Sequence, residues 1–445
     1  MKRLFATLSV VALLAGACTA GGGGSQTPQT INPSASHAPM TIEIWGQWTG
    51  REFKEFNQIF TGFEAKYPWI TVKSVPGIGD PKALAAINSG TPPDVILSFG
   101  VDNIGKFCSS GAWIPLQSYI DGPDGIDLSA FPPQALAYTS FEGNQCSLPF
   151  MTDTFGFYYN KDMFAAKGIT EPPKTMSELA DDAKKLTEFN PDGSIKVAGF
   201  VPWMAGYYCC AFNVLTMGHE FGATWYDAQG KSTFATDPAW AAGFQWQKDM
   251  VDFYGADNLA KFVAGSSDEF GSAEDFQIGR TAMMIDGEWR NAYIADEAPN
   301  LNYGTAPYPV ADDHPDLYGS GLSGGSVIGI PRGSPHEAEA WLLIKYMTTD
   351  TSTLVYCANT LNNVPTTFDA LQSPDLAVSD QFKVFLDIFR DPESIYKPPT
   401  AIGIQDQNIL SDFADKWESG SATDLQAGLQ QAAQDVDNAI AQAGP

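Results

Sequence analysis

Three carboxylates occupy places in the sequence where polar side chains commonly meet a ligand. Asp102 and Glu288 each follow an apolar run that is typical of a buried strand, and Asp153 interrupts the long apolar and aromatic run of residues 148–164. Two carboxylates about 5 to 10 Å apart can hydrolyse a glycosidic bond by general acid and base catalysis. The same groups can accept hydrogen bonds from hydroxyls without any chemistry. The three residues by themselves leave both interpretations open.

Four other segments resemble catalytic signatures, but each lacks an essential part. Residues 230–232 (Gly-Lys-Ser) end like a phosphate-binding loop, yet Trp225 stands where the first glycine is required. The His-Glu pairs at 219–220 and 336–337 lack the second histidine of a zinc-protease helix. Residues 321–325 match a hydrolase nucleophile pattern, but a loop precedes them and a strand follows. We therefore expect no enzymatic activity, no metal site and no cofactor.

The elements that must position these side chains alternate between strand and helix. Strands are predicted at residues 41–45, 70–75 and 94–98, and apolar residues at helical spacing predict helices at 53–67 and 81–89. This alternation is typical of a parallel sheet with helices on its faces. In such sheets ligands bind beyond the carboxyl ends of the strands. Those ends carry Gln47 and Trp48 after the first strand, and Phe99 and Asp102 after the third.

The run of residues 148–164 has the pattern of a strand that passes from one lobe of the protein to another. Its apolar start ends in a short polar triplet that contains Asp153, and an aromatic strand and a helix follow. Two further crossings are expected near residues 303–309 and 359–365. Clefts between domains are favoured ligand sites. We predict an α/β fold of two lobes, each a mainly parallel sheet flanked by helices, with a ligand cleft between the lobes.

The second half of the chain offers further candidate contacts beside predicted strand ends and loops. The candidates are Trp203 and Tyr207 in an aromatic loop, Glu288 and Trp289 after the strand 281–285, Gly325 and Ser326 in a turn, and Gln407 near the C-terminal helices.

Composition limits the classes of partner. With 445 residues the chain is long for a single core. Its 52 acidic and 25 basic residues give a formal net charge of -27, which repels phosphates and excludes a nucleic-acid role. The 11 Trp, 16 Tyr and 28 Phe residues exceed what a core of this size needs, so some are expected to line a binding surface.

The N-terminus has the features of a targeting segment. Two basic residues precede an apolar run that is too short to span a bilayer, and the run ends in small residues followed by Cys18. This ending resembles a bacterial lipoprotein cleavage box, and we expect residues 1–18 to be a signal peptide with a lipidated Cys18. Residues 19–39 are rich in Gly, Ser, Thr and Pro and predict a flexible tether. The protein is therefore expected outside the cytoplasm, anchored to the outer face of the membrane.

Five cysteines remain after Cys18, and none has metal-ligand spacing. Disulfides are the natural interpretation outside the cell. We pair Cys108 with Cys146, and Cys357 with either Cys209 or Cys210, which leaves one thiol free.

The body of the chain resembles the extracellular solute-binding proteins of bacterial ABC importers, in the carbohydrate-binding family that includes maltose-binding protein. The resemblance rests on residues 148–164, on residues 281–289 and on the order of elements around them. It implies a monomer that binds a mono- or oligosaccharide and delivers it to the permease subunits of a transporter. It also implies that residues 40–152 and 305–360 form the N-terminal lobe, and that residues 153–304 and 361–445 form the C-terminal lobe.

The resemblance implies roles for individual residues as well. Trp289 matches an aromatic residue that stacks on a sugar ring, and Asp153 an acidic residue that binds hydroxyls beside the first hinge. Asn103 stands where maltose-binding protein has a basic residue, and that protein's last stacking tryptophan is missing here, so the resemblance does not specify maltodextrin. Two alternatives stay open: a secreted carbohydrate-active hydrolase that uses Asp153 with Asp102 or Glu288, and a binding protein for a non-sugar solute.

Overall fold

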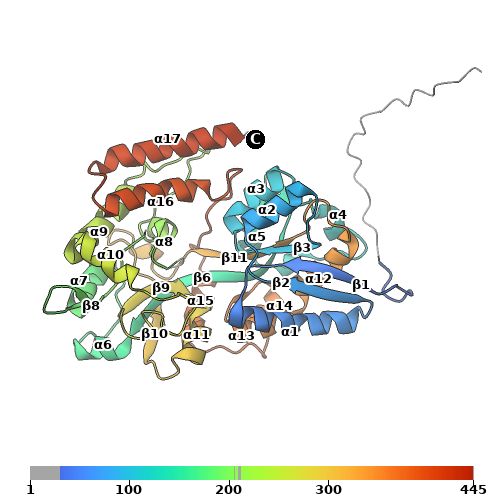
Figure 1. Cartoon of the computed structure of the whole chain (residues 1–445), viewed down its shortest axis with the longest axis horizontal. Helices are drawn as coiled ribbons and strands as arrows, with labels where there is room; N and C mark the ends of the chain where they lie inside the picture. Colours follow the sequence, from blue (N-terminus) through green and yellow to red (C-terminus); the bar gives the residue numbers. More distant parts are fainter. Residues whose placement is uncertain (1–30, 205, 209–211, 444–445) are drawn as a thin grey trace, which may run out of the picture.

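The computed structural model of the chain describes residues 31–443 except 205 and 209–211. The predicted signal peptide, the predicted lipidation site Cys18 and the first part of the predicted tether lie outside the described residues, as do Cys209 and Cys210. Figure 1 shows two lobes side by side, with the N-terminal segments in one and the helices α16 and α17 at the edge of the other. The two-lobed α/β fold predicted from the sequence is confirmed.

One eight-stranded sheet runs through both lobes, and β6 and β11 lie in the middle of the molecule (Figure 1). Its strands are β1 (Met40–Trp45), β2 (Ile70–Val75), β3 (Val95–Ser98), β6 (Leu148–Asn160), β9 (Met283–Gly287), β10 (Tyr303–Ala306), β11 (Ser323–Gly329) and β12 (Val364–Pro365). Two small hairpins lie apart from it: β4 (Ser140–Phe141) with β5 (Asn144–Gln145), and β7 (Glu188–Phe189) with β8 (Ile195–Val197).

The first lobe contains the parallel part of the sheet. Strand β1 pairs in parallel with both β2 and β3, and β11 closes this side by pairing antiparallel with β3. The short strand β3 is buried along its whole length, as expected for an apolar run at the centre of a parallel sheet. The carboxyl ends of β1 and β3 therefore meet at one edge, as the alternation of elements predicts.

Strand β6 is the crossing between the lobes. Its first half pairs with β11 and β12, and its second half, from Phe155 onward, pairs with β9 and β10. Asp153 lies just before this change of partners, which puts its side chain at the junction. The strands β9 and β10 run antiparallel to β6, so the expectation of a mainly parallel sheet fails in the second lobe. The reason is that β6 enters this lobe from the other one instead of through a helical crossover.

The helices cover both lobes. Around the first lobe lie α1 (Gly50–Lys66), α2 (Asp80–Ser89), α3 (Ile104–Ser109), α4 (Gln117–Ile120), α5 (Pro133–Ala137), α12 (Glu337–Thr349), α13 (Thr351–Leu361) and α14 (Phe368–Leu371). Around the second lie α6 (Lys161–Ala166), α7 (Met176–Leu186), α8 (Val214–Glu220), α9 (Pro238–Tyr254), α10 (Ala256–Ala264), α11 (Arg290–Glu297), α15 (Asp380–Arg390), α16 (Gln405–Glu418) and α17 (Leu425–Ala443). Single turns of 3-10 helix are η1 (Val101–Asn103), η2 (Leu128–Ala130) and η3 (Pro315–Leu317).

Two large hydrophobic cores correspond to the two lobes. One gathers buried side chains from residues 42–151 and 328–370, and the other from residues 157–311 and 402–436. Ala370 belongs to the first core, although the predicted limits assign residues 361–445 to the second lobe. The lobe limits given above stay a prediction. Within the described residues, no helix combines the length and apolarity needed to cross a membrane.

Of the two disulfides expected, one is present in the described part of the chain. Cys108 is bonded to Cys146 across a sequence separation of 38, which confirms that pairing. Cys357 is a free, buried thiol on α13, so its pairing with Cys209 or Cys210 is wrong. Its side chain is fully buried in the core of the first lobe. A sequence pattern does not reveal which lobe a cysteine faces.

Candidate ligand-binding cleft

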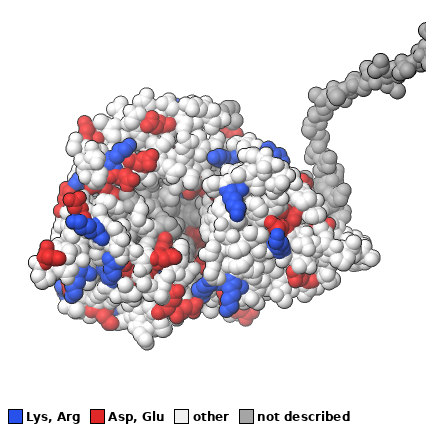
Figure 2. Space-filling view, in the orientation of Figure 1, with Lys and Arg blue, Asp and Glu red and all other residues white. Residues whose placement is uncertain are grey.

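A cleft of about 340 Å³ lies between the lobes at the junction of the sheet, and Figure 2 shows the hollow between them. This volume is within the usual range for a small-molecule site. The residues that line it come from both lobes and from the strands that join them: Trp48, Glu52, Phe99, Val101, Asp102, Asp153, Phe155, Asn213, Leu215, Thr216, Phe270, Trp289, Leu322, Ser323, Gly324, Gly325, Ser326, Asn363 and Lys397.

Seven of the residues singled out in the sequence lie in this cleft. They are Trp48, Phe99, Asp102, Asp153, Trp289, Gly325 and Ser326. They come from strand ends that are far apart in the sequence, and the shared sheet brings those ends together. Their contact with a ligand stays a prediction.

The other five predicted residues, Gln47, Trp203, Tyr207, Glu288 and Gln407, are not among the residues that line the cleft. Gln47 accepts a hydrogen bond from the Phe99 amide at 3.2 Å and thereby joins the ends of β1 and β3. The Tyr207 hydroxyl donates to Asp275 at 3.2 Å, and Trp203 packs against the second core.

Aromatic rings form two walls of the cleft. On the first lobe Trp48 packs against Phe99, with their ring centroids 5.4 Å apart, and Phe99 is 37% exposed. On the second lobe Trp289 meets Phe155 edge to face, with centroids 5.6 Å apart. Phe270 adds a ring that is 42% exposed. Exposed aromatic faces on opposite lobes can pack on an apolar ligand surface between them.

A carboxyl cluster lies beside these rings and is defined by Glu52, Asp153 and Glu288. Asn363 Nδ2 donates to Asp153 Oδ1 at 2.6 Å and to Glu288 Oε1 at 3.2 Å, and the Thr154 amide donates to Glu288 Oε2 at 2.7 Å. Glu288 is fully buried and therefore stands behind Asp153 as its support. The sequence predicts Glu288 as a ligand contact, and this stays a prediction, because in the fold its side chain is buried behind the cleft lining.

Burial changes the protonation of this cluster. Burial first, and then repulsion by Glu52, raises the pKa of Asp153 to about 7. Burial likewise raises the pKa of Glu52 to about 7, against a smaller opposing effect of Arg51. Burial raises the pKa of Glu288 well above its usual range, and the charge of Asp153 adds to this. Burial disfavours the ionised form of a carboxyl group, so these groups hold protons at a higher pH than exposed carboxyl groups do.

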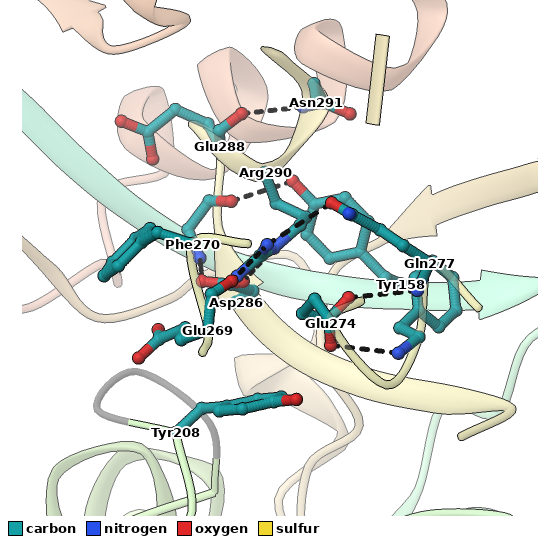
Figure 3. Close-up of polar contacts among 12 residues, drawn as sticks. Tyr158, Tyr208, Glu269, Phe270, Glu274, Gln277, Asp286, Glu288, Arg290 and Asn291 are labelled. Carbon is teal, nitrogen blue, oxygen red and sulfur yellow. Dashed lines mark hydrogen bonds and ion pairs between the residues drawn. The ribbon is translucent and has the colours of Figure 1, made fainter. Parts of the chain in front are cut away.

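A buried ion pair supports the loop that carries Phe270. Arg290 Nε lies 2.6 Å from Asp286 Oδ2, and Arg290 Nη1 donates to the Glu269 carbonyl at 2.8 Å. Figure 3 shows Arg290 between Asp286 and Gln277, with Phe270 beside them and Glu288 turned away. This network ties the loop of Phe270 to the end of β9 and to the start of α11, on either side of Trp289.

Several buried polar atoms of the cleft lack hydrogen-bond partners within the described chain. They include Trp289 Nε1, Ser323 Oγ and Asn363 Oδ1. Buried polar groups are nearly always hydrogen-bonded in native proteins, to protein, water or ligand. These atoms are therefore available to a polar ligand. No cluster of His, Cys, Asp and Glu in the described residues has the arrangement of a metal site.

Sequence reasoning missed several residues of the cleft, above all Glu52, Phe270, Asn363 and Lys397. Two signals were available: Glu52 follows the candidate Trp48 by only four positions, and Asn363 lies within the crossing predicted near residues 359–365. Helix α1 begins at Gly50, three residues before the predicted start, and so carries Glu52 in its first turn. Asn363 and Lys397 lie in connecting segments without any motif.

Comparison with known proteins gives matches over most of the chain. The family model for bacterial extracellular solute-binding proteins matches residues 47–353. The maltotriose-binding protein of Pyrococcus abyssi is 25% identical over 338 residues, covering 75% of this chain and 68% of that protein. The maltooligosaccharide ABC transporter solute-binding lipoprotein of Streptococcus pneumoniae is 27% identical over 274 residues, covering 59% of this chain and 57% of that protein.

A solved structure gives a similar result. CpMnBP1 with mannotriose bound superimposes with a TM-score of 0.80 at 27% sequence identity, covering 88% of this chain and 99% of that chain. A match of this extent includes both lobes and the cleft between them.

Proposed function

Because the chain belongs to the bacterial extracellular solute-binding protein family, we propose that it captures a sugar or oligosaccharide in the cleft between its lobes. The proposed contacts are Trp48, Phe99, Asp102, Asp153, Trp289, Gly325 and Ser326, together with Glu52, Phe270 and Asn363.

One observation carries this proposal: aromatic faces and unpartnered polar atoms line the same cleft. The C–H faces of a sugar ring are apolar and pack on aromatic rings, while its hydroxyls donate to carboxylates and amide oxygens. Trp289 and Phe99 supply such faces from opposite lobes, and Asp153 supplies acceptors beside them. The mannotriose bound to CpMnBP1 and the maltotriose in the name of the Pyrococcus relative support an oligosaccharide ligand.

The proposed cycle is one of closure and delivery without any covalent step. A ligand that touches both lobes favours the closed state, because only closure completes its contacts. The closed, loaded protein would then dock on the membrane permease of an ABC transporter. Lipidation at Cys18 would keep it at the outer face of the membrane, as the name of the lipoprotein relative from Streptococcus suggests.

The first test is a titration of the chain from residue 19 onward with mannotriose, maltotriose and a panel of mono- and oligosaccharides. Intrinsic tryptophan fluorescence and melting temperature are the readouts. A saturable change with one sugar class, lost in Trp289→Ala and without any cleaved product, supports the proposal. Folded protein that responds to no sugar would contradict it, and a cleaved product would indicate a hydrolase.

A further inference from the structure

The cleft contains a buried cation that the function described so far does not use. Lys397 is the single Lys or Arg among the residues that line the cleft in the described chain. It lies in the connecting segment between α15 and α16, more than two hundred residues from the other charged groups of the first-lobe wall. Its side chain is 1% exposed. A lysine is rarely buried to this extent, so its position needs an explanation.

Carboxylates from both lobes hold the Lys397 ammonium. Its Nζ lies 2.9 Å from Asp406 Oδ2 on α16 and 3.9 Å from Asp102 Oδ1 on η1. It also lies 5.4 Å from the centroid of the Trp225 ring. Asp406 is fully buried and is fixed in turn by the Tyr226 hydroxyl, which donates to it. These contacts fix the position of the ammonium group at the wall of the cleft.

The Lys397 ammonium nevertheless has hydrogen-bonding capacity to spare. The 2.9 Å contact with Asp406 engages one of its three N–H groups, and no further hydrogen bond of Nζ to the described residues is present. The distance of 3.9 Å to Asp102 is beyond hydrogen-bond reach. Asp102 itself lines the cleft. A donor of three N–H groups and an acceptor carboxylate therefore stand side by side at the cleft wall.

We propose that Lys397 is a specificity-determining contact of the cleft, whose ammonium donates to one hydroxyl of a bound sugar while the adjacent hydroxyl donates to Asp102. The inference rests on the proposed function and deepens it. Of two neighbouring ring hydroxyls, one can accept a hydrogen bond from the ammonium while the other donates a hydrogen bond to the carboxylate. The site therefore selects sugars that present a vicinal diol at this position. A sugar that lacks either hydroxyl leaves a buried charge without its partner.

The test measures affinity for mannotriose and maltotriose by calorimetry, and then for monodeoxy derivatives of whichever binds. The variants are Lys397→Met and the charge-balanced Lys397→Met/Asp406→Asn. Lys416→Met on the exposed part of α16 serves as the matched control, because Lys416 does not line the cleft. Melting temperatures establish that each variant folds. In the wild-type protein, the ¹⁵N resonance of the Lys397 ammonium reports the contact directly.

We expect Lys397→Met to weaken binding of the parent sugar by about 10- to 100-fold, as for loss of a charge-assisted hydrogen bond. Removal of the ring hydroxyl that contacts Lys397 should lower the affinity of the wild type by a similar factor. The same removal should not lower the affinity of Lys397→Met any further. The ammonium resonance should shift when the sugar is added, and Lys416→Met should bind like the wild type. If Lys397 has only a structural role, Lys397→Met should lower the affinity for all sugar derivatives equally, and the ammonium resonance of the wild type should not shift when sugar is added. That result would overturn this inference but not the proposal of sugar binding. Absence of any binding to the wild type would overturn both proposals.

Discussion

Asp153 and Glu288 lie against the same side-chain amide, Asn363 Nδ2, at 2.6 and 3.2 Å. One carboxyl comes from the crossing strand, the other from the end of β9 in the second lobe, and Asn363 immediately precedes β12. Two crossings of the chain and the end of a second-lobe strand therefore meet at one donor group. Two carboxyl groups that share a single donor in a buried place cannot both be ionised without cost. Raised carboxyl pKa values therefore lie at the junction between the two lobes.

We predict that the stability of the protein falls as the pH rises from acidic values toward neutrality. Asp153 has a folded-state pKa of about 7 against an ordinary value of 3.8, so the folded state holds a proton that the unfolded state has already lost. The free energy of unfolding should therefore decrease between about pH 4 and pH 7 and level off above that. Asp153→Asn should reduce this decrease by about 1–2 kcal/mol, since cleft water screens part of the effect.

Urea unfolding of the wild type and Asp153→Asn at pH 5.5 and pH 8 measures this difference. The exposed Asp313 offers a matched control, because Asp313→Asn changes the same charge away from the cleft. An equal pH dependence in the wild type and Asp153→Asn would contradict the prediction.

Gly287→Ala should displace Trp289 and weaken sugar binding. A Cβ atom at Gly287 would lie 2.1 Å from the Trp289 ring, and an indole ring cannot move aside as a flexible side chain can. We expect a loss of stability of about 1–3 kcal/mol from this overpacking, with the stacking face displaced from the cleft. Fluorescence titration with whichever sugar the wild type binds should show at least about a tenfold loss of affinity, comparable to loss of an aromatic contact. Gly79→Ala is the control, since its Cβ meets only Pro81 at 3.8 Å. Unchanged affinity in Gly287→Ala would argue against Trp289 as a contact.

Glu220 is a buried carboxyl for which we predict a protonated state. It is fully buried, neither carboxyl oxygen has a hydrogen-bond partner among the described residues, and burial raises its pKa well above the usual range. At pH values between the ordinary carboxyl pKa and this raised one, the unfolded chain has lost the proton that the folded state still holds, so the wild type should lose stability as the pH rises. Glu220→Gln cannot ionise and should gain on the order of 1–2 kcal/mol relative to the wild type between pH 5 and pH 9. Thermal unfolding at both pH values measures this difference, with the exposed Glu171→Gln as the control. The same pH dependence of stability in all three proteins would contradict a protonated Glu220.

The disulfide between Cys108 and Cys146 should stabilise the first lobe. It closes a loop over a sequence separation of 38, for which the loss of chain entropy in the unfolded state predicts about 3–4 kcal/mol. The double variant Cys108→Ala/Cys146→Ala should unfold at correspondingly lower denaturant concentration. Cys357→Ala should have a smaller effect because that thiol is free and only a small buried group is removed. Equal midpoints for the double variant and the wild type would show that the bond does not form in solution.

Local patterns in the sequence are enough to predict the first strands and helices, and to predict that some of the aromatic residues of the cleft follow strands. The alternation of apolar runs and helical spacing predicts β1, α1, β2, α2 and β3 nearly as they occur. It also predicts that Phe99 and Asp102 follow a buried strand, and that Trp289 follows another. These predictions succeed because hydrophobic periodicity and strand ends are properties of short segments.

Contacts between distant segments were decided by the tertiary structure alone. Lys397 reaches the cleft because the segment before α16 packs against the first lobe, where the Ile404 amide donates to Asn103 at 3.3 Å. Asn363 meets Asp153 because β12 pairs with β6. The register of β9 against β6 decides whether the Glu288 side chain points into the cleft or is buried behind it. The sequence by itself determined which residues end the strands. The tertiary structure decided which of them meet, because such contacts depend on sheet register and lobe packing between residues that are hundreds of positions apart, and no local periodicity encodes them.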